Sequence, residues 1–157
     1  MQIGEQDHRY RLQKFWQPYH DKLHVVLNDI RKRFGYAILL DAHSIRSVLP
    51  ELFDGTLPDL NLGTFKGVSA APTLISASFN ALAKHTDYSS VLDGRFQGGY
   101  ITRNYGRPNE GVHALQLEMA QTTYMTEQPP LYQQDCADRV STVLRDLVTT
   151  LLQWSPS

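Results

Sequence analysis

Cysteine is almost absent from this 157-residue chain, in which Cys136 is the single example. One cysteine allows neither an intrachain disulfide nor a cysteine-based zinc cluster. Long apolar runs are also missing, because no stretch approaches the roughly 20 residues that a membrane span requires. The first residues lack the basic and apolar pattern of a signal peptide. These absences predict an unexported protein of the reducing cytoplasm that has no membrane partner.

The chain carries no excess of charge of either sign. Its formal net charge is -1, and its 41% hydrophobic and 20% charged residues are ordinary for a globular protein. The basic cluster Arg31-Lys32-Arg33 falls at the expected end of a helix, where cations complement the exposed carbonyl groups. We therefore expect no nucleic-acid partner, since such proteins present a basic surface. The length is that of a single domain, residues 1–157.

Apolar spacing and the positions of glycine and proline predict alternating helices and strands. A long amphipathic helix is expected from His8 to Phe34, broken near Gln17 because Pro18 removes a backbone hydrogen bond, and ended by Gly35. Two more helices are expected over residues 72–84 and, behind the cap Asp135, near the C-terminus. Strands are expected over residues 36–40, 60–64, 89–93 and 113–119, with a short extended piece over 100–105. Because several strands follow one another without helices between them, we predict a layered α/β fold with a mixed sheet flanked by helices.

The end of the first expected strand is the first candidate site. Its apolar residues stop abruptly before Asp41, His43, Ser44 and Arg46, and a strand of an α/β sheet delivers such side chains to the crevice at its carboxyl end. His43 is either a metal ligand or a structural histidine that bonds a neighbouring carbonyl group. Asp41 either orients the imidazole of His43 or caps the following loop.

Glu118 is the second candidate. In the alternating stretch 113–119, apolar residues share one face, and Glu118 falls on the other with Ala114 and Gln116. A buried carboxylate requires a cation, a hydrogen-bond partner or a chemical role, since leaving it charged and unpaired costs several kcal/mol. Glu118 is thus either a general base or one half of a buried salt bridge to an arginine.

Four arginines fall in the loops expected to flank the crevice. They are Arg46, Arg95, Arg103 and Arg107. The planar guanidinium group binds carboxylates through two hydrogen bonds, so a site holding several arginines suits a small acidic substrate. The alternative is that two of the four are solvated surface charges. Among the histidines outside the expected strands, only His20 is placed where it could approach the same crevice.

The ordered motifs of the chain resemble a known family. They are Tyr19-His20-Asp21, Leu40-Asp41-Ala42-His43-Ser44-Ile45-Arg46, Leu60-Asn61-Leu62-Gly63-Thr64, Gly94-Arg95-Phe96-Gln97-Gly98-Gly99-Tyr100-Ile101-Thr102-Arg103, Tyr105-Gly106-Arg107-Pro108 and Val112-His113-Ala114-Leu115-Gln116-Leu117-Glu118. In this order they closely resemble the N-formylglutamate amidohydrolase family over almost the whole chain. The resemblance implies hydrolysis of N-formyl-L-glutamate, a small acidic N-acyl amino acid, to L-glutamate and formate in bacterial histidine degradation.

The resemblance also implies a zinc cofactor and a set of site residues. His43 corresponds to a zinc ligand, and Glu118 to the carboxylate that activates the metal-bound water, whose pKa zinc lowers to about 7. The positions implied to hold the substrate are Arg46, Asn61, Tyr100, Arg103 and Arg107. The implied fold is that of the zinc-dependent exopeptidases (phosphorylase/hydrolase-like), without its N-terminal strands in this chain.

The chain lacks motifs that members of the family share upstream. Its members share upstream segments that contribute another histidine ligand, a further ligand and a substrate arginine, and none of these motifs precedes His8. The chain therefore resembles the larger, C-terminal part of the family's domain. Since a catalytic zinc takes three protein ligands, we expect weak zinc binding and little deformylation, with Asp41 or His20 as substitute ligands. An uncovered sheet edge would favour self-association. The second hypothesis is a non-catalytic homologue that binds an acidic amino acid or a partner protein.

Overall fold

The structure is a computed structural model that describes residues 4–156. It divides into two compact units, residues 1–37 and residues 38–157, here called the helical unit and the sheet unit. None of the helices within residues 4–156 combines the length and the apolar character needed to cross a membrane.

The helical unit is a continuous helical path with one irregular turn. Helix α1 (Glu5–Arg11) leads into a π-helical turn (Leu12–Trp16), which leads into α2 (Gln17–Phe34). The predicted kink or break near Gln17 is confirmed, because the π turn ends at Trp16 and Pro18, which cannot donate a hydrogen bond to the preceding turn, lies in the first turn of α2. Gly35 ends α2 as predicted, with φ 85° and its N–H group donating to the Arg31 carbonyl at 2.8 Å.

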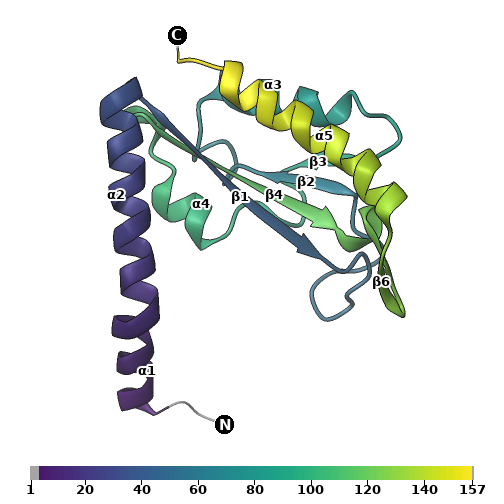
Figure 1. Ribbon diagram of the computed structural model, residues 1–157, viewed down its shortest axis with the longest axis horizontal. Coiled ribbons are helices and arrows are strands. Elements are labelled where there is room, and N and C mark those ends of the chain that lie inside the picture. The colour runs from purple at the N-terminus through teal and green to yellow at the C-terminus, as the bar shows by residue number, and fades with distance from the viewer. Residues whose placement is uncertain (1–3, 157) are drawn as a thin grey trace. The chain divides into compact units, whose positions relative to one another are not determined.

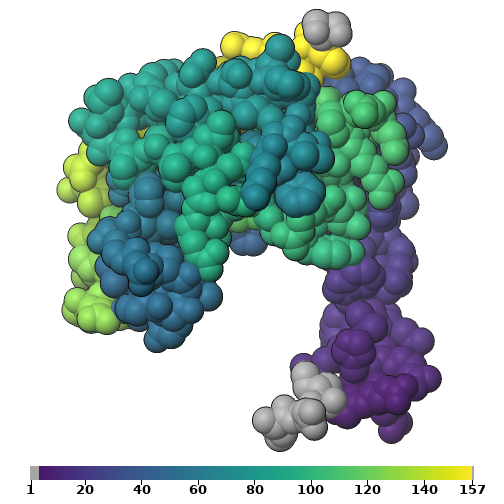
Figure 2. Space-filling model, turned by 180° about the vertical axis from the view of Figure 1, so that it is seen from behind, coloured from purple at the N-terminus to yellow at the C-terminus, as the bar shows by residue number. Residues whose placement is uncertain are grey.

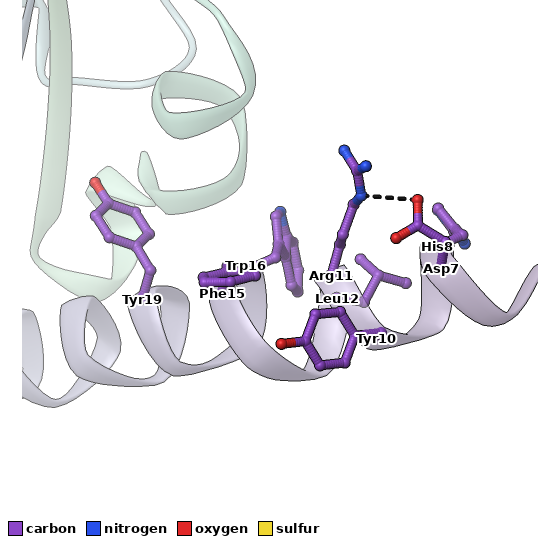
Figure 3. Close-up of a pocket in the computed structure, with 8 residues that line it drawn as sticks. All are labelled: Asp7, His8, Tyr10, Arg11, Leu12, Phe15, Trp16 and Tyr19. Carbon is purple, nitrogen blue, oxygen red and sulfur yellow. Dashed lines mark ion pairs between the residues drawn. The ribbon is translucent and has the colours of Figure 1, made fainter. Parts of the chain in front are cut away.

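Aromatic side chains gather on one side of the helical unit, around a shallow hollow (Figure 3). This aromatic helix face consists of Tyr10, Leu12, Phe15, Trp16 and Tyr19, all of which are exposed. Asp7 and Arg11 form an ion pair of 3.0 Å beside it. The π turn brings residues from either side of it onto the same face, since it inserts extra residues into the helical repeat.

The sheet unit is built on a mixed four-stranded sheet (Figure 1). Its strands are β1 (Ala37–Ile45), β2 (Leu60–Gly63), β3 (Ser90–Leu92) and β4 (Val112–Ala120), in the order β1-β4-β2-β3. Strand β2 is parallel to β3 and antiparallel to β4, which confirms the predicted mixed sheet. The likeness to the zinc-dependent exopeptidase fold stays a prediction.

One face of the sheet carries the hydrophobic core. Helices α3 (Pro72–Ala83) and α5 (Gln134–Gln153) pack against each other and against this face. The strands contribute Leu60, Leu62, Leu115 and Leu117, each at most 1% exposed. The prediction that Asp135 caps α5 is wrong: Gln133 holds the cap position, and Asp135 lies in the first turn, where its charge still favours the N-terminal end of the helix dipole.

The opposite side of the sheet unit is covered by loops and a short helix. Seen from behind, its surface is formed by blue to green segments from the middle of the chain, while the yellow α5 shows only at the margin (Figure 2). Helix α4 (Tyr100–Tyr105) lies against β4. The prediction of an extended piece over 100–105 is wrong, because Thr102 and Tyr105, three residues apart, are both buried on one helical side.

Short elements complete the sheet unit. Two 3-10 turns, Pro108–Glu110 and Gln121–Thr123, flank β4. A hairpin of β5 (Met125–Glu127) and β6 (Pro130–Tyr132) follows, where the sequence indicates only a break at the two prolines. Glu127 ties this hairpin to the end of β1, since its carboxylate accepts hydrogen bonds from the Ser47 N–H group at 2.6 Å and from the Ser47 hydroxyl at 3.0 Å.

Candidate functional site

Polar residues occupy the face of the sheet that α3 and α5 leave uncovered. In the β2–β4 register, Asn61 stands opposite Glu118 and Gly63 opposite Gln116, so their side chains share one face while the leucines between them enter the core. Asp41 and His43, two residues apart on β1, lie together by the same alternation. The polar sheet face is hereafter Asp41, His43, Asn61, Gln116 and Glu118.

Asp41 and His43 form a pair within β1. The distance from Asp41 Oδ2 to His43 Nε2 is 2.9 Å, and the His43 side chain is about half exposed. The prediction that the strand stops at Leu40 is wrong, because β1 continues to Ile45. His43 therefore projects from the strand itself, where β-sheet geometry fixes its direction. The contact with Asp41 matches the predicted arrangement in which a carboxylate orients the imidazole.

Glu118 is a buried carboxyl group, 6% exposed. Burial raises its pKa above the usual value, while the charge of His43 lowers it, that of Asp41 raises it and a hydrogen bond from Gln116 lowers it. Within residues 4–156, no ion pair joins Glu118 to an arginine. The buried salt bridge, one of the two interpretations of Glu118, is therefore not formed. A buried carboxyl group with a raised pKa and charged neighbours is typical of groups that transfer protons.

Asn61 fixes the backbone of β4 at Glu118. Its Nδ2 atom donates to the Glu118 carbonyl oxygen at 3.1 Å and to the Pro58 carbonyl oxygen at 2.7 Å. Its Oδ1 atom is buried and accepts no hydrogen bond from the described residues. Buried acceptors normally have a partner, so this oxygen is an available acceptor for a bound molecule.

Gln116 is a site residue that the sequence-based selection missed. It is 5% exposed, and it connects the polar sheet face to a glycine-containing turn, since its Oε1 atom accepts from the Gly99 N–H group at 2.6 Å. The signal that could have found it is the alternation that indicated Glu118, because residues 116 and 118 share a face. The turn residues 97–99 are hereafter called the glycine turn.

The predicted substrate residues are not all gathered in one place. Arg103 Nη1 donates to the Gly98 carbonyl at 2.9 Å, which links this arginine to the glycine turn, and Tyr100 begins α4 beside it. Arg107 Nη1 lies 3.9 Å from Glu110 Oε2. Arg46 lines a separate cavity between the loop after β1 and the β5–β6 hairpin. Within the described residues, neither Arg46 nor Arg107 has a hydrogen bond or ion pair with His43 or Glu118.

Two further residues from the sequence analysis have other surroundings. The Arg95 Nε atom donates to the Leu52 carbonyl at 2.7 Å, and its guanidinium group lies 5.7 Å from the centre of the Phe96 ring. Arg95 therefore fastens the long loop after β1 to the segment after β3. His20 lies on α2, in the helical unit, with its ring 4.1 Å from that of Trp16.

The side chains present do not form a complete zinc site. Within residues 4–156, no group of three or more histidine, cysteine, aspartate or glutamate side chains is arranged to hold a metal ion. A catalytic zinc takes three protein ligands and keeps one open position. His43 can supply one ligand, although its Nε2 atom lies against Asp41.

Comparison with known proteins agrees with the ordered motifs. The sequence profile of N-formylglutamate amidohydrolase matches residues 2–125. The chain belongs to the N-formylglutamate amidohydrolase family. It is 52% identical over 152 residues to an N-formylglutamate deformylase of Pseudomonas putida, and 50% identical over 152 residues to one of Pseudomonas aeruginosa. Each match covers 96% of this chain and 57% of the relative, so the chain spans somewhat more than half the length of these two amidohydrolases.

A solved amidohydrolase structure shows the same fold. The crystal structure of N-formylglutamate amidohydrolase from Ralstonia eutropha JMP134 matches with a TM-score of 0.75 and 26% sequence identity. The match covers 92% of this chain and 51% of the solved one. The helices and mixed sheet described above are therefore an arrangement found in a member of the family.

Proposed function

We propose that the polar sheet face is part of an active site that hydrolyses N-formyl-L-glutamate to L-glutamate and formate. The observation that carries the proposal is the buried carboxyl group of Glu118 beside the Asp41–His43 pair. Family membership and two relatives named N-formylglutamate deformylase support the choice of substrate. The reaction belongs to bacterial histidine degradation in the same proposal.

Glu118 is the general base in this reaction. Its carboxylate takes a proton from a water molecule as the water oxygen attacks the formyl carbon, which leaves a tetrahedral intermediate. The carboxyl group then returns the proton to the amide nitrogen, the C–N bond breaks, and glutamate departs with a neutral amine. Burial raises the pKa of Glu118, and a carboxyl group with a pKa nearer neutrality performs both transfers better.

The substrate is a dianion, and the arginines are proposed to bind its two carboxylates. Arg103 stands at the glycine turn, and we assign Arg46, Arg107 and Tyr100 to the same task, with Asn61 Oδ1 as an acceptor for the substrate N–H group. Guanidinium groups bind carboxylates through paired hydrogen bonds, which would position the formyl carbon for attack.

We propose zinc as the cofactor of this family site, with His43 as one ligand. The side chains described above supply no group of three ligands, so we expect the chain to hold zinc weakly. The alternative function follows from the same observation: a homologue without catalysis that keeps the arginines and binds an acidic amino acid or a partner protein.

The deciding experiment combines elemental analysis for zinc with a formate-release assay on N-formyl-L-glutamate. We expect the purified chain to contain well under one zinc and to turn over slowly, below the roughly 1 per second at which typical enzymes begin. His43→Ala should lower the zinc content further. Near one zinc per chain with fast turnover would contradict the expectation of weak zinc binding.

The same assay tests the role of Glu118. Glu118→Gln keeps the size of the side chain and removes the base, so turnover should fall by roughly 100-fold or more. Asp87→Asn, at an exposed carboxylate outside the polar sheet face, is the control. Equal turnover in Glu118→Gln and the original chain would overturn the proposed base, and binding of glutamate without any turnover would favour the alternative function.

A further inference from the structure

Gln116 lies in the candidate site but has no role in the proposed reaction as described above. It lies two residues before Glu118 on β4, buried in the same polar sheet face. A buried amide group needs a hydrogen-bond donor and an acceptor nearby, because unpaired polar groups are costly to bury. Both sides of the Gln116 amide have such a partner, and the two partners belong to different parts of the site.

The oxygen of the amide holds the glycine turn. Gln116 Oε1 accepts from the Gly99 N–H group at 2.6 Å, and Gly99 is the N-cap residue directly before α4. Helix α4 carries Tyr100 and Arg103, two of the proposed substrate residues. The nitrogen of the amide faces the base, since Gln116 Nε2 lies 3.4 Å from Glu118 Oε2.

The glycine turn is packed so closely that its position is well defined. A methyl group added at Gly63 would lie 2.6 Å from the Gly98 nitrogen, so the backbone of β2 touches the turn directly. On the other side, the Phe65 N–H group donates to the Gln97 carbonyl at 2.6 Å. The Gln116 amide therefore joins two pieces of well-fixed backbone, β4 and the start of α4.

We propose that Gln116 is a positioning residue that fixes the start of α4 and the Glu118 carboxylate relative to each other. The proposal rests on the proposed function, because it concerns the same site. Substrate held by α4 and the base that activates water must meet within a fraction of an ångström, and small displacements of a reacting group are costly in rate. Among the described residues, the Gln116 amide contacts both the Gly99 N–H group and the Glu118 carboxylate.

Two substitutions distinguish the contact made by the Gln116 amide oxygen from the contact made by its nitrogen. Gln116→Glu has the same shape and still accepts from Gly99, but it no longer donates to Glu118 and adds a charge beside it. Gln116→Leu removes both interactions. Gln121→Leu, in the turn after β4 at a glutamine whose side chain makes no hydrogen bond to the other described residues, controls for the loss of a glutamine elsewhere.

The first measurement does not depend on catalysis. Hydrogen exchange of the Gly99 amide, followed by NMR on isotope-labelled protein, should be accelerated about tenfold or more in Gln116→Leu. It should remain slow in Gln116→Glu and in the Gln121→Leu control. Unchanged exchange in Gln116→Leu would overturn the proposal, because the amide would not be holding the turn.

The second measurement separates binding from turnover. Both variants should lower turnover at saturating substrate by about tenfold or more, and Gln116→Glu should also weaken binding of N-formyl-L-glutamate, because its added charge repels the dianion. Turnover at saturating substrate in Gln116→Leu equal to that of the original chain would also overturn the proposal. If the original chain neither binds nor cleaves N-formyl-L-glutamate, the proposed function fails, while the Gly99 exchange still reports whether Gln116 fixes the turn. Should Gln116→Leu fail to fold, Gln116→Asn, whose side chain is one carbon shorter and cannot reach Gly99 in the same way, takes its place and should accelerate the Gly99 exchange.

Discussion

The surroundings of Glu118 affect both its capacity to transfer a proton and the free energy of unfolding of the chain. Its carboxyl group is buried by the packing of the sheet, and it lies near one cationic partner, His43, and one anionic neighbour, Asp41. Burial dominates, so the neutral acid is favoured in the folded chain. A group that is useful as a proton carrier for this reason is also a source of instability when it ionises.

Glu118→Gln should therefore change how stability depends on pH. The unfolded chain ionises Glu118 near the usual value of about 4.3, while the folded chain keeps the proton to higher pH because its pKa is raised. Stability that is present below the usual value is lost as the pH rises through the raised pKa. The advantage of Glu118→Gln over the original chain should grow as the pH rises from the usual value through the raised pKa. Urea unfolding in the presence of a chelator measures this, and parallel pH profiles would contradict it.

His113 should show the opposite pH dependence. Burial lowers its pKa, since the ring lies on the core side, accepts from the Ala71 N–H group at 3.2 Å and meets the Trp154 ring edge-on. The unfolded chain takes up the proton near pH 6.5, so stability present above that pH is lost as the pH falls below it. His113→Asn should flatten this loss, whereas His8→Asn, at an exposed histidine, should leave it unchanged. Guanidinium unfolding from pH 8 to 5 is the measurement.

The sequence predicted several of the residues that lie in the candidate site, but it did not predict which groups they contact. Alternation placed Glu118 on the face opposite the leucines, as the register of β2 and β4 confirms. It did not indicate that Asn61 donates a hydrogen bond to the Glu118 carbonyl oxygen, or that the Gln116 side chain accepts one from the Gly99 N–H group. Those contacts join positions that are distant in sequence, and the pattern of one segment contains no information about what lies across from it.

The glycine turn is the element that organises the polar side of the sheet unit. It starts α4, contacts β2 and receives hydrogen bonds from Phe65 and Arg103. Periodicity predicted α3 and the core strands because their apolar residues repeat regularly. It misjudged α4, since a six-residue helix has less than two turns in which to show a period, and its helical form depends on burial of Thr102 and Tyr105 against the sheet unit.

Gly63→Ala should disturb this element. The added methyl group would lie 2.6 Å from the Gly98 nitrogen and 2.9 Å from the Gln97 carbonyl carbon, both backbone atoms that cannot swing away. We expect a loss of about 1–3 kcal/mol in the free energy of unfolding, as for other overpacked sites. Gly4→Ala, where an added methyl group meets nothing within 4 Å, should change it little. Equal midpoints in urea for both variants would contradict the close packing.

At the scale of the whole molecule, the helical unit presents an unusual surface. Phe15 and Tyr19 are 64% and 58% exposed on the aromatic helix face. Apolar surface of this kind is a common cause of association. The predicted exposed sheet edge is a second possible contact, since β1 and β3 are the outermost strands. The aromatic helix face could not be recognised as a contact surface from the sequence, because a helical period identifies an apolar face without saying whether another part of the chain covers it.

Self-association of the chain should therefore depend on the aromatic helix face. Sedimentation over a wide range of concentrations should show a rising average mass, and Phe15→Glu with Tyr19→Glu should lower it by placing charges on that face. Val25→Glu, at an exposed valine outside that face, is the matched control and should leave the mass unchanged. If the double variant associates as the original chain does, the contact lies elsewhere, and the sheet edge becomes the surface to test.

Strand β4 limits how the gene for this protein can change in length. Six of its consecutive residues, 113–118, are buried, and successive side chains serve the core and the polar sheet face in turn. Inserting or deleting one codon there would send Leu117 toward the polar residues and Glu118 into the leucines. The loop over residues 46–59 has no such alternation, so codons can be gained or lost there without moving any side chain to the wrong side of the sheet.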